Sequence, residues 1–138
     1  MSFKILIVSA NYYKNISNNL EKDTRESLDL FVKPDEVKYK IINVRGVFEI
    51  PVVISKYINE YDGFISLACV IKGETPHFNF ISTSATDAIM KLSINHKKPI
   101  GNGIITCLNK EQAVKRSKTK GKEAAAAVYD VLLKFKYD

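Results

Sequence analysis

Two short stretches of the chain are almost entirely apolar, and they limit the possible folds more than any other feature. They are FKILIVSA at residues 3–10 and GFISLACVI at residues 63–71. Both are too short to cross a bilayer, and neither shows the alternation of a strand with one face in water. Such runs are typical of strands that are covered on both faces. The chain is therefore expected to build a sheet between two layers of helices.

The segments around these runs show helical spacing or strict alternation, and each predicts one further element. The apolar residues of 16–31 fall mainly on one helical stripe. Asn109, followed three residues later by Gln112, resembles a capping box, which marks the start of a helix. Helices are expected at about 16–31, 50–58, 77–94, 109–115 and 120–135, with further strands at 37–44 and 99–106.

Strands and helices alternate along the chain, and this order predicts the fold class. A strand, a helix and a second strand normally form a right-handed crossover between parallel strands. The expected fold is α/β, a three-layer α/β/α sandwich in which helices cover both faces of a four-stranded parallel sheet. Because 138 residues suffice for only one hydrophobic core, residues 1–138 are expected to form a single domain.

The composition argues against several classes of protein. Hydrophobic residues make up 46% of the chain and charged residues 26%, which is the balance of a folded, soluble protein. The net charge of +6 favours anionic partners, but the basic residues are scattered, so nucleic acid is not expected. Cys69 and Cys107 lack the spacing of a disulfide framework or a zinc site. No membrane span or signal peptide is recognised, and the expected location is the cytoplasm.

Ligands of parallel α/β sheets bind beyond the carboxyl ends of the strands, so the loops there are the first places to search for a site. Four such loops are 9–13 (SANYY), 45–51 (RGVFEIP), 72–78 (KGETPHF) and 106–109 (TCLN). The third places a glycine, a carboxylate, a hydroxyl and a histidine between a buried strand and a helix start. Backbone N–H groups in such a loop can bind a phosphate or another anion.

Two histidines lie at opposite ends of the same predicted helix. At its start, the positive end of the helix dipole favours a neutral imidazole for His77, which can then accept a proton. His77 could equally be a partly exposed helix residue without a function. At the far end, a cationic His96 would simply complement the dipole, so no function is expected there.

Other residues in these regions have interpretations that the sequence leaves open. Glu49 either caps a helix or points into a ligand cleft. Phe48 and Tyr12 could stack on a flat ring, although aromatic residues in such positions more often pack against the protein. Taken alone, Arg116 and Lys120 belong to a solvated basic face.

Taken together, the motifs resemble those of the lumazine synthase family. They are GVFEIP at 46–51, ACVIKGETPHF at 68–78, PIGNGIIT at 99–106, EQAVKR at 111–116 and KGKEAA at 120–125. All of them occur in the order found in that family, and the resemblance runs from the first strand to the last helix. It implies a flavodoxin-like fold and the penultimate reaction of riboflavin biosynthesis.

Lumazine synthases condense 5-amino-6-(D-ribitylamino)uracil with 3,4-dihydroxy-2-butanone 4-phosphate to give 6,7-dimethyl-8-ribityllumazine, phosphate and water. The implied steps are attack of the amine on the ketone, imine formation, elimination of phosphate and ring closure. The resemblance thus implies a transferase with small-molecule substrates, no metal and no organic cofactor. The alternative is a protein of the same fold that binds flavin or lumazine without catalysis.

The resemblance also implies a role for each site residue. His77 matches the family's proton-transfer residue and is the expected catalytic group. An arginine suits phosphate because its planar guanidinium pairs with two oxygens. The expected contacts of the butanone phosphate are Glu74, Thr75, Arg116 and Lys120. Those of the pyrimidine and its ribityl chain are Tyr12, Val47, Phe48, Glu49, Cys69, Val70, Ile71 and Asn102.

A homo-oligomer is implied as well, because the active sites of the family lie between adjacent subunits of a pentamer. The neighbouring subunit would contribute the Asn102 and Arg116 positions. Some features depart from the family pattern: Asn79 replaces an acid that often follows the histidine and its aromatic neighbour, and the loop at 116–121 is shorter than the common form. The chain also begins almost directly at its first strand. The short loop and early strand favour a pentamer or a decamer over an icosahedral shell.

Overall fold

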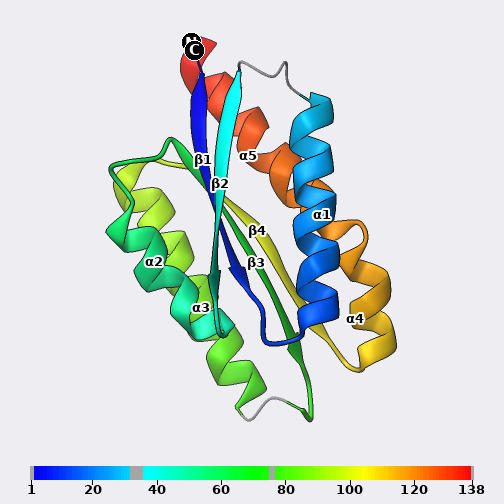
Figure 1. Ribbon diagram of the computed structural model, residues 1–138. Coiled ribbons are helices and arrows are strands. Elements are labelled where there is room, and N and C mark those ends of the chain that lie inside the picture. The colour runs from blue at the N-terminus through cyan, green and yellow to red at the C-terminus, as the bar shows by residue number, and fades with distance from the viewer. Residues whose placement is uncertain (1, 32–35, 75–76, 138) are drawn as a thin grey trace.

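A computed structural model of the protein describes residues 2–31, 36–74 and 77–137, and within them it shows one parallel sheet (Figure 1). All neighbouring strands are parallel, in the order β2-β1-β3-β4. The predicted α/β class is therefore confirmed. The strands are β1 (Phe3–Ala10), β2 (Val37–Val44), β3 (Gly63–Ile71) and β4 (Ile100–Cys107).

Helices cover both faces of this sheet, which completes the three-layer sandwich (Figure 1). Alternate residues of each strand point to opposite faces, so the sheet contributes to two core clusters. Of the helices in the described ranges, none combines the length and the apolar character that a membrane span requires. One face carries α1 (Lys14–Phe31), α4 (Lys110–Ser117) and α5 (Lys120–Tyr137), and the other carries the 3-10 helix η1 (Val47–Glu49), α2 (Ile50–Lys56) and α3 (Phe78–His96).

The predicted element boundaries agree best for the strands and least for the helix ends, four of which differ by two residues from the prediction. β2 and β3 have the predicted bounds, whereas α1 begins two residues earlier than expected. The helix expected at 50–58 ends earlier and is preceded by the 3-10 turn η1. The capping residue of α4 is confirmed, because the Asn109 side chain accepts a hydrogen bond from the Gln112 N–H at 2.9 Å. The Gln112 side chain in turn accepts one from the Leu108 N–H at 2.9 Å.

Helices α1 and α5 approach each other closely at Gly121. A Cβ atom at this position would lie 2.6 Å from the Leu20 carbonyl oxygen and 2.8 Å from the Thr24 backbone nitrogen. Beside this contact, the Lys122 N–H donates to Asp23 Oδ2 at 2.6 Å. The glycine therefore allows the start of α5 to pack directly on α1, and this packing positions the junction between α4 and α5.

We expect the Gly121→Ala substitution to destabilise the protein by about 1–3 kcal/mol, because the added methyl group meets backbone atoms that cannot rotate away. Urea denaturation followed by circular dichroism measures the change in the free energy of unfolding. An alanine normally stabilises a helix relative to glycine. A stability equal to or above that of the unmodified protein would therefore contradict the close approach.

The outer side of the edge strand β4 is partly occupied by side chains. In a parallel ladder the backbone groups of alternate residues face opposite sides, and the carbonyls of Pro99 and Cys107 face β3. Two of the groups that face away from β3 have side-chain partners. The Ile104 N–H donates to Asn102 Oδ1 at 3.1 Å, and the Thr106 carbonyl accepts from the Arg116 guanidinium at 2.9 Å. Part of the carboxyl half of this edge is thus hydrogen-bonded without another strand.

Candidate active site

A pocket of about 480 Å³ lies beyond the carboxyl ends of β1, β2 and β3. The strand order reverses between β1 and β3, and such switch points are the usual ligand sites of parallel α/β sheets. The volume of the pocket suits a small organic ligand. Its lining residues come from four segments: the loop after β1 (Asn11, Tyr12), the segment after β2 (Arg45, Gly46, Val47, Phe48, Glu49), the end of β3 (Cys69, Val70) and the first turn of α3 (Ile81).

Two aromatic side chains of this pocket are open to solvent. Tyr12 is 68% exposed and Phe48 is 60% exposed, so neither is part of the core. Tyr12 makes one edge-to-face contact with Tyr13, at 4.9 Å between ring centroids. The pocket therefore offers aromatic surface that the protein itself does not cover, which suits a flat ligand ring.

Glu49 has both of the roles that its sequence position allows, because it closes a turn and also borders the pocket. Its Oε1 accepts a hydrogen bond from the Gly46 N–H at 3.0 Å, which closes the turn that leads into η1. The same side chain is exposed and lines the pocket. One carboxylate oxygen thus fixes the loop, and the carboxylate still borders the space where a ligand would lie.

The end of β3 contributes only part of the wall predicted for it. Cys69 and Val70 line the pocket. Ile71 is fully buried in the core cluster beneath α1 and α5, and it does not line the pocket. The single chain therefore brings Cys69 and Val70, but not Ile71, to the candidate site.

The pKa of the Cys69 thiol is raised to about 12, mainly by burial and also by the neighbouring Cys107 thiol and the Glu74 carboxylate. Arg116 has an opposing, lowering effect. Because the ordinary pKa is 9.0, the unfolded chain loses this proton at a lower pH than the folded one. The contribution of Cys69 to stability is therefore complete below pH 9 and declines as the pH rises toward 12.

We expect Cys69 to resist alkylation at pH 8, because only the thiolate reacts and its fraction in the folded protein is about 10⁻⁴ at that pH. Iodoacetamide labelling followed by peptide mass mapping measures the rate. The same protein in concentrated urea is the control, and there Cys69 should be labelled about 10³-fold faster. Rapid labelling of Cys69 in the folded protein would contradict the raised pKa.

The loop between β3 and α3 begins with a turn in which the Glu74 N–H donates to the Ile71 carbonyl at 3.2 Å. Gly73 has a φ of 86°, a conformation that favours glycine. Glu74 is exposed, and its carboxylate acts electrostatically on Cys69. Thr75, a predicted phosphate contact, lies outside the described residues. The described part of the loop thus directs Glu74 toward the end of β3.

His77 is exposed and is the N-cap residue of α3, with a left-handed backbone at φ 58° and ψ 37°. N-cap residues are usually extended, and a left-handed conformation is unfavourable for most residues other than glycine. Strained residues of this kind gather at functional sites. The His77 side chain makes no capping hydrogen bond, so the helix start does not occupy its imidazole.

Arg116 lies on α4 at the carboxyl end of β4. Its Nη1 atom donates to the Thr106 carbonyl at 2.9 Å and lies 3.7 Å from Cys107 Sγ. Both contacts use the same nitrogen. Within the described part of the chain, the Nε and Nη2 side of the guanidinium has no hydrogen-bonding partner. That side can therefore bind two oxygens of an anion.

Six of the predicted site residues that the structure describes do not line the pocket of the single chain: Ile71, Glu74, His77, Asn102, Arg116 and Lys120. Asn102 is exposed on β4, Arg116 is exposed on α4, and Lys120 is the half-buried first residue of α5. Arg116 is nevertheless close enough to Cys69 to act on its pKa. Within the described residues, no group of three or more His, Cys, Asp or Glu side chains could hold a metal ion.

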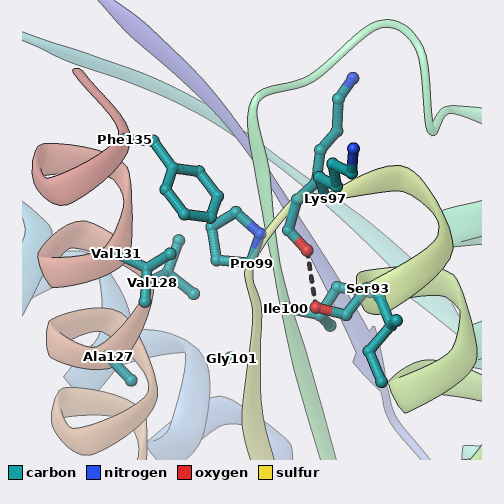
Figure 2. A pocket seen from close by; sticks show the side chains of 11 residues that line it. Ser93, Lys97, Pro99, Ile100, Gly101, Ala127, Val128, Val131 and Phe135 are labelled. Atoms are coloured by element: carbon teal, nitrogen blue, oxygen red, sulfur yellow. Dashed lines mark hydrogen bonds between the residues drawn. The ribbon is translucent and has the colours of Figure 1, made fainter. Parts of the chain in front are cut away.

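A second pocket, of about 380 Å³, lies at the opposite end of the sheet, where β4 begins. Figure 2 shows the Phe135 ring beside Pro99, and the Ser93 hydroxyl donates to the Lys98 carbonyl at 2.7 Å. No carboxylate or imidazole is found among the described residues that line it. Because it also lies away from the carboxyl ends of the strands, the first pocket is the better candidate for an active site.

Four further residues line the first pocket and were not predicted as site residues: Asn11, Arg45, Gly46 and Ile81. Asn11 and Arg45 lie in two of the loops identified for the search, and their positions just after a strand were an available signal. Ile81 offered none, because it follows the same apolar spacing as the core residues of its helix.

Comparison with known proteins decides the family of this chain. A family profile described as 6,7-dimethyl-8-ribityllumazine synthase matches residues 2–136. The chain belongs to the lumazine synthase family. Because the match extends over nearly the whole sequence, all candidate residues of the pocket and of the α4–α5 junction lie in the region shared with lumazine synthases.

Proteins named 6,7-dimethyl-8-ribityllumazine synthase are similar to this chain over most of their length. That of Bartonella tribocorum is 37% identical over 141 residues, which cover 96% of this chain and 91% of the relative. That of Agrobacterium fabrum is 37% identical over 139 residues, covering 93% and 91%. That of Sulfurimonas denitrificans is 35% identical over 137 residues, covering 94% and 87%. The similarity to lumazine synthases is thus not confined to one motif.

Proposed function

We propose that this protein condenses 5-amino-6-(D-ribitylamino)uracil with 3,4-dihydroxy-2-butanone 4-phosphate to give 6,7-dimethyl-8-ribityllumazine, phosphate and water. One observation supports this most directly: a single pocket at the strand ends gathers most of the residues expected to bind the pyrimidine. They are Tyr12, Val47, Phe48, Glu49, Cys69 and Val70.

In this proposal the pocket binds the pyrimidine substrate. The exposed rings of Tyr12 and Phe48 provide apolar surface for the flat heterocycle. The Glu49 carboxylate accepts hydrogen bonds from the ribityl hydroxyls, and its bond to the Gly46 N–H holds it in place before the substrate arrives. Cys69 and Val70 line the inner wall. Ile71, buried behind them, would support the wall rather than touch the ring.

The second substrate is assigned to the positively charged groups near the end of β4. The Nε and Nη2 side of Arg116 would bind two phosphate oxygens, with Glu74, Thr75 and Lys120 as further contacts. His77 would transfer protons during imine formation, phosphate elimination and ring closure. Much of the rate would come from holding two substrates side by side, which converts an encounter between molecules into a local reaction.

We also propose that the active sites are completed between subunits of a homopentamer or decamer. Asn102, Arg116 and Lys120 do not line the pocket of their own chain, which is consistent with a role in the site of a neighbour. The layer of η1, α2 and α3 also exposes several large apolar side chains, and apolar groups that gather on a surface are typical of protein interfaces. These side chains are Phe48, Val52, Phe80, Met90 and Ile94.

The cytoplasm is the proposed location of this enzyme. Cys69 and Cys107 are both free thiols, although they lie near each other at the ends of β3 and β4. Unpaired cysteines are the normal state in a reducing compartment.

Mixing the purified protein with both substrates tests the reaction. The expected result is the fluorescence of the lumazine product together with stoichiometric release of phosphate. A signal no higher than the spontaneous background reaction would overturn the proposal. Binding of the lumazine without any turnover would instead indicate the non-catalytic alternative.

Light scattering tests the assembly in the same preparation. The expected mass is that of five or ten chains. A mass that corresponds to a single chain would contradict the proposed shared sites, and one that corresponds to an icosahedral shell would contradict the preference for a pentamer or decamer.

A further inference from the structure

Arg45 is the basic residue of the candidate pocket. It follows the last residue of β2 directly, and its side chain is exposed. Among the described residues that line the pocket, Arg45 is the only cation and Glu49 is the only acid. The two charged groups that a ligand would meet here therefore come from one short loop, on the same side of the pocket as Phe48.

The Arg45 guanidinium has no bonding partner in the part of the chain that the structure describes. Within the described residues it makes no hydrogen bond and no ion pair, and it lies more than 4.0 Å from the Glu49 carboxylate. Glu49 has one oxygen bonded to the Gly46 N–H. The loop thus presents a set of free N–H donors and a free carboxylate oxygen to the pocket, without neutralising either group internally.

This combination suits a neutral chain of hydroxyl groups. Each hydroxyl both donates and accepts, so it can bond to a carboxylate and a guanidinium at the same time. A phosphate is less suitable, because the nearby Glu49 carboxylate would repel it. The exposed Phe48 ring lines the same pocket and offers a surface for an apolar, flat part of the same ligand.

We propose that Arg45 binds the ribityl hydroxyls of the pyrimidine substrate together with Glu49, and that it determines specificity for the polyol chain. This inference rests on the proposed function and adds to it a residue that recognises the ribityl chain of the substrate. Arg45 contributes to the binding of the chain and not to the binding of the ring.

Two lumazines with the same ring separate these contributions. 6,7-Dimethyl-8-ribityllumazine carries the polyol, whereas 6,7,8-trimethyllumazine has a methyl group in its place. We expect Arg45→Ala to weaken binding of the ribityl compound about tenfold, as for the loss of a hydrogen bond to a charged group. Binding of the trimethyl compound should not change. Fluorescence titration at constant ionic strength measures both dissociation constants.

The Arg25→Ala variant is the matched control, because it removes the same charge from the exposed surface of α1, on the other face of the sheet. It should leave both affinities unchanged, and Arg45→Lys should restore part of the preference for the ribityl compound. Equal weakening of both lumazines by Arg45→Ala, or no weakening of either, would overturn the assignment of Arg45. If the unmodified protein bound neither lumazine, the proposed function itself would fail.

Discussion

Replacing Arg116 with alanine is expected to lower kcat/KM by about 10³-fold, because a guanidinium that binds two phosphate oxygens makes charge-assisted hydrogen bonds that no neighbouring group replaces. Most of the loss should appear as a higher KM for the butanone phosphate. The structure supports this expectation through the free Nε and Nη2 side of the group, while Nη1 is held by the Thr106 carbonyl. Steady-state kinetics with each substrate varied in turn measures the effect.

Lys115→Ala is the matched control for Arg116→Ala, since it removes a positive charge from an exposed position on the same helix. It should change neither KM. Arg116→Lys should fall between the unmodified protein and the alanine variant, because an ammonium keeps the charge but not the planar pair of donors. An Arg116→Ala variant with an unchanged KM for the butanone phosphate would exclude Arg116 from phosphate binding.

The second large effect is expected for His77→Ala, which should lower kcat by about 10²-fold, at the lower end of the range for a single acid–base group. Turnover should not be abolished, because the binding of two substrates side by side supplies much of the rate. KM for both substrates should stay nearly constant, since the proposed role of the imidazole is to move protons.

The pH dependence of kcat distinguishes a proton-transfer role from a structural one. His77→Ala should lose a step in the profile that the unmodified protein shows, whereas His96→Ala, at the far end of α3, should retain it. A His77→Ala protein that is folded, binds both substrates normally and has no activity would contradict the prediction of residual turnover.

Co-expression of the two variants tests whether the sites are shared between subunits. If one chain supplies both His77 and Arg116 to each site, a mixture of the two variants contains no intact site. Its activity then stays at the low level of the separate proteins. If they act across an interface, random mixing in a ring leaves about a quarter of the sites intact. Recovery to roughly that level supports the shared site, and its absence from verified mixed oligomers would exclude it.

The fold could be predicted from the sequence because its main signals are local. The apolar run at 63–71 and the alternation at 37–44 each define a strand, and their observed bounds are the predicted ones. The start of α3 could not be predicted to the residue. Helical spacing continues through His77, whereas its left-handed backbone leaves no trace in the periodicity.

The pocket was predictable in part for a similar reason. In a parallel sheet the carboxyl ends of the strands meet at one edge, so loops distant in sequence were expected together, and Tyr12, Phe48 and Cys69 do share a pocket. Ile71 faces the same layer as Cys69 but does not line the pocket, because its side chain is fully buried in the core cluster there. Arg45 was missed because an exposed arginine after a strand resembles any solvated charge. The proposed substrate contact of Asn102 would require a neighbouring chain.

The hydrogen bonds on the outer side of β4 bear on how the protein can misassemble. A bare sheet edge can act as a template for cross-β growth, in which copies add strand by strand into an open-ended fibril. Here the Asn102 amide and the Arg116 guanidinium already occupy backbone groups that an incoming strand would need. The same side chains proposed to serve a neighbour's chemistry would thus also protect concentrated solutions of the folded protein against fibril formation.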